Sequence, residues 1–178
     1  MIIGEALKEV FKGLEIEEQT VQFGYGDQKE LNKWVSFQNS NNNKKYPLIW
    51  YVKTGYNEFN GDYKVNARLL VLMNTKVEWL NTTRTVKTYN VYINPLTDLI
   101  TQRLKGNSFI QIDGSNFEKF KFIDYPSYGV NQDSMNSIRL AQNDFQSTKK
   151  NSTQSITTDI VDAKVIDFGM TIKVKCII

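Results

Sequence analysis

The chain has 178 residues, and its 22 Lys plus Arg against 19 Asp plus Glu give a net charge of +3, with no His and one Cys. A length close to that of one ordinary domain predicts a single domain over residues 1–178. The absence of imidazole excludes a Ser-His-Asp or Cys-His nucleophile and a His-ligated zinc, and a lone Cys excludes an internal disulfide framework or a cysteine-rich metal cluster.

The composition predicts a folded chain without a leader or membrane segment. At 40% hydrophobic and 12% aromatic residues, the sequence lies well above the range of disordered chains. The N-terminus has no basic region followed by an apolar core, and the chain nowhere has an apolar run of about 18 residues. We therefore expect neither secretion nor membrane insertion.

The N-terminal segment predicts an amphipathic helix that ends near Gly13. Its apolar side chains recur every three or four residues and so share one stripe: Ile3, Leu7, Val10, Phe11 and Leu14. Val21, Phe23 and Tyr25 alternate with Gln22 and Gly24, which predicts a strand. Residues 38–45 contain no apolar side chain, and we expect them to form a loop.

Two core strands are predicted next. Residues 48–52 form a continuous apolar run, typical of a strand covered on both faces. In residues 65–73 every odd position is apolar, which predicts a second strand. Residues 57–62 between them have turn composition, so we expect an antiparallel pair.

Residues 82–104 predict a helix, because Tyr89, Ile93, Leu96, Ile100 and Leu104 recur at a helical period. Pro95 lies inside this pattern. An interior proline removes a helical hydrogen bond, so we expect the helix to kink or to split there, with Asn94 as cap and Pro95 as first residue of the second part.

The remaining third predicts a hairpin, a polar excursion and a final strand. Residues 108–123 place the turn dipeptide Asp113-Gly114 between two apolar runs, which is typical of a hairpin. Residues 131–155 are almost entirely polar and longer than an ordinary loop. From Ile166 to Cys176 every second residue is apolar, which predicts a strand with a buried thiol.

The order of these segments predicts an α+β fold with a mainly antiparallel sheet. An N-terminal amphipathic helix and a central proline-containing helix would pack on one face of that sheet. The polar excursion at 131–155 would be a long insertion, extended or mobile.

Catalytic chemistry would have to come from carboxylates, since no histidine is present. The nearest cluster is Asp159, Asp162 and Asp167. We expect Asp159 and Asp162 to be solvated acids in a surface turn before the last strand, so no catalytic, cofactor-binding or metal-binding residue is assigned. A carboxylate- or metal-dependent hydrolase that uses these three residues is kept as the alternative.

Signals for phosphate or nucleic acid are weak. Gly24-Tyr25-Gly26 follows a strand but lacks a third suitably placed Gly and a following Lys-Ser/Thr, so a simple turn at Gly26-Asp27 is expected. The basic and aromatic residues of 117–122 alternate as they would on any half-buried strand. A small nucleic-acid-binding domain stays a second alternative.

Aromatic side chains exceed the number that one core needs, and a surplus suits protein interfaces, where Trp and Tyr contribute much of the binding energy. The aromatics near loop-rich regions are Trp34, Phe37, Trp50, Tyr51, Tyr56, Phe59, Tyr63, Trp79, Tyr125 and Tyr128. This favours an assembly subunit over an enzyme.

The layout resembles the tail terminator and tail completion proteins that form rings at head-tail junctions of tailed phages, in particular those of Bacteroidota phages. The resemblance covers about half of the chain. It is carried by four stretches in order: the helix Ile3 to Leu14, Tyr46-Pro47-Leu48-Ile49-Trp50, the strand Leu69 to Met73 followed by Trp79, Arg84, Tyr89, Ile93, Pro95 and Leu96, and Asp159-Ile160-Val161-Asp162-Ala163 before the terminal strand.

The resemblance implies a structural virion protein without catalytic residues or cofactors, made in the host cytoplasm and located in the neck or tail. It implies a homo-oligomeric ring of 6 or 12 copies that contacts portal, adaptor or tail proteins, near the DNA channel and away from any membrane. The chain is longer than a compact terminator, chiefly at 108–123 and 131–155, so a tail terminator and a connector ring both remain open.

Overall fold

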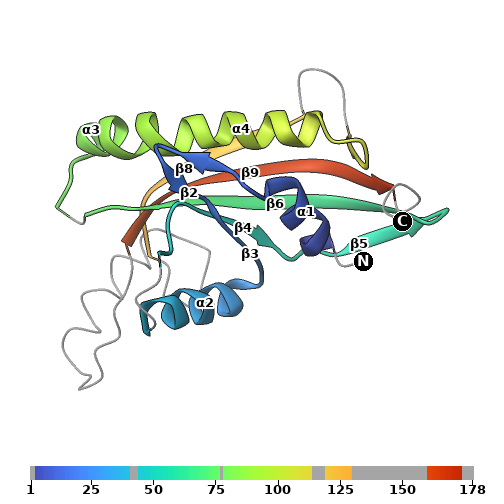
Figure 1. Ribbon diagram of the computed structural model, residues 1–178, viewed down its shortest axis with the longest axis horizontal. Helices are drawn as coiled ribbons and strands as arrows, with labels where there is room; N and C mark the ends of the chain where they lie inside the picture. The colour runs from blue at the N-terminus through green and yellow to red at the C-terminus, as the bar shows by residue number, and fades with distance from the viewer. Residues whose placement is uncertain (1–2, 41–43, 77, 114–118, 130–159, 174–178) are drawn as a thin grey trace.

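The structure is a computed structural model that describes residues 3–40, 44–76, 78–113, 119–129 and 160–173. It is an α+β fold in which helices cover a mixed, mostly antiparallel seven-stranded sheet (Figure 1). The predicted fold class is confirmed at this level. Residues 131–155 and Cys176 lie outside the described residues, and so do the predictions made for them.

Two long strands form the centre of the sheet. β6 (Asp62–Asn74) pairs antiparallel with β9 (Ile160–Lys173) along its entire length. The alternation in the sequence explains this pairing, because the alternating apolar positions that it identified in the two strands face the same core. Val65, Ala67, Leu69, Val71, Met73, Ile166, Phe168, Met170 and Ile172 are all buried there. The strand predictions for 65–73 and for the described part of 166–176 are confirmed.

Each central strand has an interrupted strand along its outer edge. β4 (Leu48–Val52) and β5 (Tyr56–Phe59) follow one another along β6, and β4 is antiparallel to β6 as predicted. β7 (Ile110–Ile112) and β8 (Lys121–Gly129) follow one another along β9. β3 (Gln22–Gly26) lies beyond β4 and pairs with it in parallel.

The predicted hairpin at 108–123 is wrong. β7 and β8 both pair antiparallel with β9, so they run in the same direction and do not pair with each other. The chain leaves β9 after Asp113, whose backbone N–H still donates to the Gly169 carbonyl, and it rejoins β9 at Lys121. A turn dipeptide indicates where a strand stops, but it does not specify the next partner.

The turn predicted at 57–62 contains fewer residues than expected. Tyr56–Phe59 is a strand, and only Asn60 and Gly61 form the connection to β6. Both have positive φ values, 52° and 81°. Asn-Gly is the pair that two-residue hairpin turns prefer, because both positions need the left-handed conformation.

The N-terminal helix is confirmed. α1 (Ile3–Phe11) buries its apolar stripe against the sheet and ends before Gly13, which has a φ of 68°. A short ribbon of β1 (Glu15–Ile16) and β2 (Gln19–Thr20) then leads into β3.

The central helix continues through Pro95 without the expected break. α3 (Asn81–Arg84) passes into a π-helical stretch, η1 (Thr85–Ile93), and then into α4 (Asn94–Lys105). Ile93 and Asn94 keep helical dihedrals, and the Asn94 backbone N–H donates to the Tyr89 carbonyl five residues back. Pro95 sits in the first turn of α4, where its missing N–H is tolerated. Asn94 does not cap the helix, because its side chain accepts a hydrogen bond from Lys164 Nζ at 2.6 Å.

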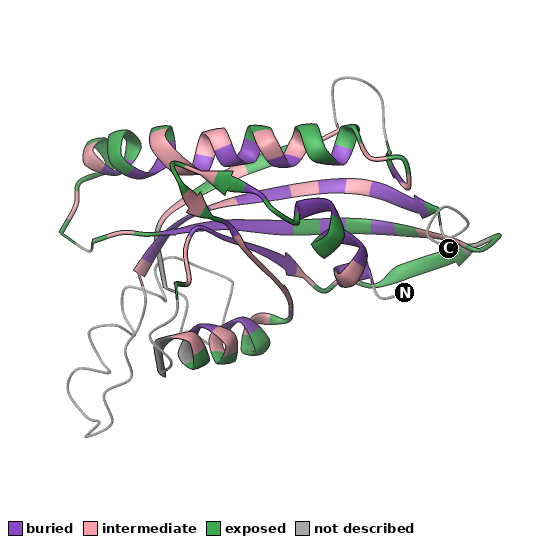
Figure 2. Cartoon of the chain, in the orientation of Figure 1, coloured by how far each residue is buried: buried purple, intermediate pink, exposed green. Residues whose placement is uncertain are grey.

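A helix that the sequence patterns did not predict covers the opposite face of the sheet. α2 (Gln28–Ser40) connects β3 to the parallel strand β4, and such a connection needs a crossover. It buries Leu31 and Val35 in a second core with Leu48, Trp50, Leu70, Leu72, Val161, Ala163 and Val165. The two helices that the sequence predicted, α1 and the central helix, do pack on one face, since both contribute to the same core. Because α2 lies on the opposite face and extends to Ser40, a fold with helices on one face only and a loop beginning at residue 38 were wrong predictions, and Figure 2 shows buried positions on both sides of the sheet.

A reciprocal pair of hydrogen bonds starts α2. The Glu30 backbone N–H donates to Asp27 Oδ1 at 2.8 Å, and the Asp27 backbone N–H donates to Glu30 Oε2 at 2.7 Å. This is a capping box, which satisfies amides that the first helical turn leaves without partners.

We expect Asp27→Ala to lower the free energy of unfolding by about 1 kcal/mol, because it removes the cap acceptor. Urea denaturation followed by circular dichroism measures this change. Lys29→Ala, an exposed substitution in the same turn, is the matched control and should have a smaller effect. Equal effects of the two variants would contradict the role of the cap.

Candidate functional site

The two most buried charged residues of the described chain form an ion pair between the central helix and β9. Arg84 and Asp162 are 2% and 0% exposed, and Arg84 Nη1 donates to Asp162 Oδ1 at 2.9 Å. Two charges removed from water are tolerated only when paired and hydrogen-bonded. The pair therefore fixes the start of the central helix onto β9.

The Arg84 guanidinium also organises the connection between β6 and α3. It donates to Thr75 Oγ1 at 2.9 Å and to the carbonyls of Lys76 at 2.6 Å and Trp79 at 2.9 Å. The Trp79 ring in turn has Lys76 Nζ and Lys87 Nζ at 5.8 and 5.0 Å from its centroid. One buried side chain thus holds a connection whose described residues, 75, 76 and 78–80, belong to no helix or strand.

Asp162 has further partners on η1. The Thr88 hydroxyl donates to Asp162 Oδ2, and the Tyr89 hydroxyl donates to the neighbouring Ala163 carbonyl at 3.1 Å. Burial, with Asp162 and Asp124 nearby, raises the pKa of the Tyr89 phenol well above its ordinary value. This constellation satisfies its polar groups internally and has the character of a structural centre.

The three carboxylates of the hydrolase alternative do not come together. Asp162 is buried and paired, so it is not the solvated surface acid that the sequence suggested. Asp167 lies five residues along the same strand, hence on the opposite face, and forms a bidentate pair with Arg68 at 2.7 and 2.8 Å. Asp159 lies outside the described residues. Within the described ranges, no group of three or more metal-ligating side chains is close enough to hold an ion.

The glycines at the end of β3 serve packing and the turn into α2. A Cβ on Gly24 would lie 2.4 Å from the Trp50 ring, and Gly26 has a φ of 150°. Gly26 is the last residue of β3, and the capping box of α2 begins at the next residue, Asp27. The turn predicted at Gly26-Asp27 is therefore the passage from β3 into α2.

The basic segment near β8 does not form a separate surface feature. Phe120 packs on the core against Phe168, while Lys121 and Phe122 are exposed.

None of the described helices is long and apolar enough to cross a membrane.

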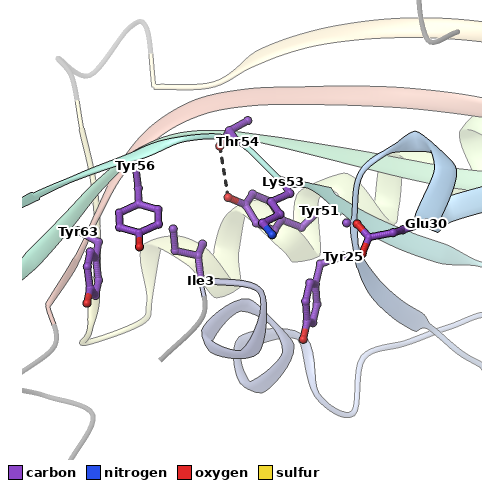
Figure 3. A pocket seen from close by; sticks show the side chains of 9 residues that line it. Ile3, Tyr25, Glu30, Tyr51, Lys53, Thr54, Tyr56 and Tyr63 are labelled. Atoms are coloured by element: carbon purple, nitrogen blue, oxygen red, sulfur yellow. Dashed lines mark hydrogen bonds between the residues drawn. The ribbon is translucent and has the colours of Figure 1, made fainter.

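A tyrosine-lined cavity of about 480 Å³ lies between α1, β3 and the junction of β4 with β5. Figure 3 shows Tyr56 and Tyr63 on one side of it and Tyr25 and Glu30 on the other. The remaining lining residues are Ile3, Gly26, Tyr51, Lys53 and Thr54. The Tyr25 hydroxyl donates to Glu5 Oε1 at 2.6 Å, and this bond raises the pKa of Tyr25. The cavity thus combines aromatic walls with one cation and one carboxylate.

Large apolar side chains are exposed on several separate elements. Phe122 on β8 is 47% exposed and Phe37 on α2 is 63% exposed. Leu80, Val86 and Tyr56 are exposed at the start of the central helix, on η1 and on β5. Of the aromatic residues predicted to exceed the needs of the core, Trp50 and Tyr51 are buried and Phe37 and Tyr56 are at the surface. Four others are half-buried: Trp34, Tyr63, Trp79 and Tyr125.

Comparisons of the chain with protein-family models, with curated proteins and with solved structures find no match.

We expect Asp162→Ala to lower the free energy of unfolding by about 3–5 kcal/mol, because it leaves the Arg84 guanidinium buried without its counter-charge. The double variant Arg84→Met/Asp162→Leu should recover part of the loss. Asp167→Ala, which removes a carboxylate from the exposed pair, is the matched control and should cost about 1 kcal/mol or less. Urea denaturation measures all three, and a similar loss for both Asp variants would contradict the central role of the buried pair.

The raised pKa of Tyr89 predicts a loss of stability in alkali. The folded state holds the phenolic proton to a higher pH than the unfolded state, in which the pKa is near 10.0. This stabilisation is complete below pH 10.0 and is lost as the pH rises through the folded pKa. We expect the free energy of unfolding to fall more steeply above pH 10.0 in the unmodified chain than in Tyr89→Phe. Identical pH profiles from urea titrations would contradict the assignment.

Proposed function

We propose that the chain is a structural subunit of a tailed-phage virion that assembles into a closed ring at the portal, neck or tail junction. It acts there as a tail terminator or a connector ring. The proposal rests on the resemblance of four ordered stretches to tail terminator and tail completion proteins, and on where the chain exposes its apolar side chains.

The observation that supports assembly most directly is that different surfaces carry exposed aromatic residues at the two ends of the sheet. β8, an outermost strand beside β9, exposes Phe122. At the other end lies β3, and α2, which packs beside it, exposes Phe37. A ring requires a heterologous contact, in which one surface of a subunit meets a different surface of the next. Two unlike surfaces at opposite ends of a sheet meet this requirement.

The geometry of the buried ion pair also supports the proposal. Arg84 and Asp162 belong to two separate stretches that carry the resemblance, and the fold brings them together at 2.9 Å. If ring proteins have Arg84 and Asp162 in common with this chain, the reason would be that the two residues stabilise the fold. A subunit that acts through shape and contact needs no catalytic residue or cofactor.

The partners in this proposal are 6 or 12 copies of the chain itself and the portal, adaptor or tail proteins on either side. DNA would pass near the ring without specific recognition. The protein would be made in the host cytoplasm and end in the virion.

We expect light scattering of the purified chain to give a ring-sized mass, and Phe122→Asp to shift it toward the monomer by placing a charge in the contact. Gln102→Asp, at an exposed position of α4, adds the same charge away from the sheet edge and should leave the mass unchanged. Mass spectrometry of purified particles is the decisive measurement. The absence of the chain from the particles would refute the proposal.

A further inference from the structure

The sheet contains a position for one more strand. β3 pairs with β4 from Gln22 opposite Leu48 to Gly26 opposite Val52, and the chain then turns into α2. β4 continues in the same direction as β5 after Lys53–Gly55. In the part of the chain that the structure describes, no strand therefore lies beside β5 on the side away from β6.

Three residues of β4–β5 face only two residues of β6 at this interruption. Val52 is opposite Arg68 and Tyr56 is opposite Val65, so 53–55 stand against 66 and 67. This count is that of a β-bulge, which bends a strand and redirects its side chains. The bulge places Lys53 and Thr54 at the cavity.

The backbone of β5 has hydrogen-bonding groups directed away from β6. Phe59 and Asp62 flank the two-residue turn, so they exchange hydrogen bonds with each other. In an antiparallel pair, opposed residues that exchange hydrogen bonds alternate with opposed residues that do not. Glu58 and Tyr63, the next opposed residues, therefore do not bond to each other, and the N–H and C=O of Glu58 point away from β6, as do those of Tyr56. Tyr56, Asn57 and Glu58 are all exposed.

The tyrosine-lined cavity opens beside this edge. Tyr56 and Tyr63 form its wall on the β5–β6 hairpin, with ring centroids 5.1 Å apart and planes at 83° (Figure 3). Lys53 and Glu30 give the cavity one charge of each sign, so the tyrosine rings, not a net charge, dominate its selectivity. Aromatic walls favour a large apolar or aromatic side chain.

We propose that the outer edge of β5 and the tyrosine-lined cavity together form a docking site for an extended segment of a neighbouring protein subunit. The segment adds to the sheet as a strand beside β5 and places one aromatic or large apolar side chain in the cavity. A polypeptide strand is the ligand that satisfies both features, because its backbone pairs with the open edge and its alternate side chains enter the pocket. The identity of the partner as an assembly neighbour rests on the proposed function, whereas the docking itself does not.

The test uses isotope-labelled protein and the synthetic strand acetyl-Thr-Val-Thr-Phe-Thr-Val-Thr-amide. At saturating peptide, we expect amide exchange at Tyr56 and Glu58 to slow by about tenfold or more, since these N–H groups gain partners. Replacing the central Phe of the peptide by Ala should weaken binding about tenfold, because the cavity is then left unfilled. No slowing at Tyr56 and Glu58, or equal binding of both peptides, would overturn the proposal.

Two variants of one residue isolate the backbone contribution. Glu58→Pro removes an outward N–H without removing a β5–β6 hydrogen bond and should abolish peptide binding, whereas Glu58→Ala keeps the N–H and should retain it. Unchanged exchange at Asn57 and Phe59 verifies that the hairpin is intact in the proline variant. A peptide N-methylated at every residue, which blocks both of its edges, makes the same test on the unmodified protein and should not bind, and binding by it or by Glu58→Pro would overturn the proposal.

The outcomes separate this inference from the proposed function. Peptide docking by a chain that is absent from virions supports the docking site and refutes only the virion role. A chain that is present in virions but does not protect its β5 amides keeps its proposed function and loses the docking site.

Discussion

The Arg84–Asp162 pair is the interaction on which the arrangement of the other elements depends. It joins the central helix to β9, and through Thr75, Lys76 and Trp79 it also holds the connection that leaves β6. β6 and β9 are the two strands on which every other strand of the sheet except β3 pairs directly. A single buried guanidinium thus links the central ladder to the helical layer that covers it.

Periodicity predicted the elements whose side chains divide clearly between core and solvent. α1, β6, β9 and the central helix were readable because their apolar residues keep one period over many positions. α2 was missed because Leu31 and Val35 are its only fully buried apolar residues in the described chain. Its start was nevertheless present in the sequence as Asp27 followed by Glu30, a capping-box pattern.

The candidate sites were beyond sequence reasoning for a different reason: their residues come from distant segments. In the sequence, nothing distinguishes Asp162 from other carboxylates near the end of a strand. Its role depends on Arg84, which is 78 positions away in the chain and which only the fold brings next to it. The cavity likewise takes Ile3 from α1, Tyr25 from β3 and Tyr63 from β6. Composition indicated a surplus of aromatic residues, but only the register of β3 on β4, and of β4 and β5 on β6, places four tyrosines around one space.

The π-helical stretch Thr85–Ile93 determines how the side chains at one end of the central helix are rotated about the helix axis relative to those at the other end. Arg84 at one end must face Asp162, and Leu96, Ile100 and Leu104 at the other end must face the core. Each residue of an α-helix advances the side-chain direction by about 100°. Loss of one residue from the wider turns would therefore rotate one end against the other and separate the ion pair from the apolar stripe. The length of this stretch is as strongly constrained as the identity of the residues that flank it.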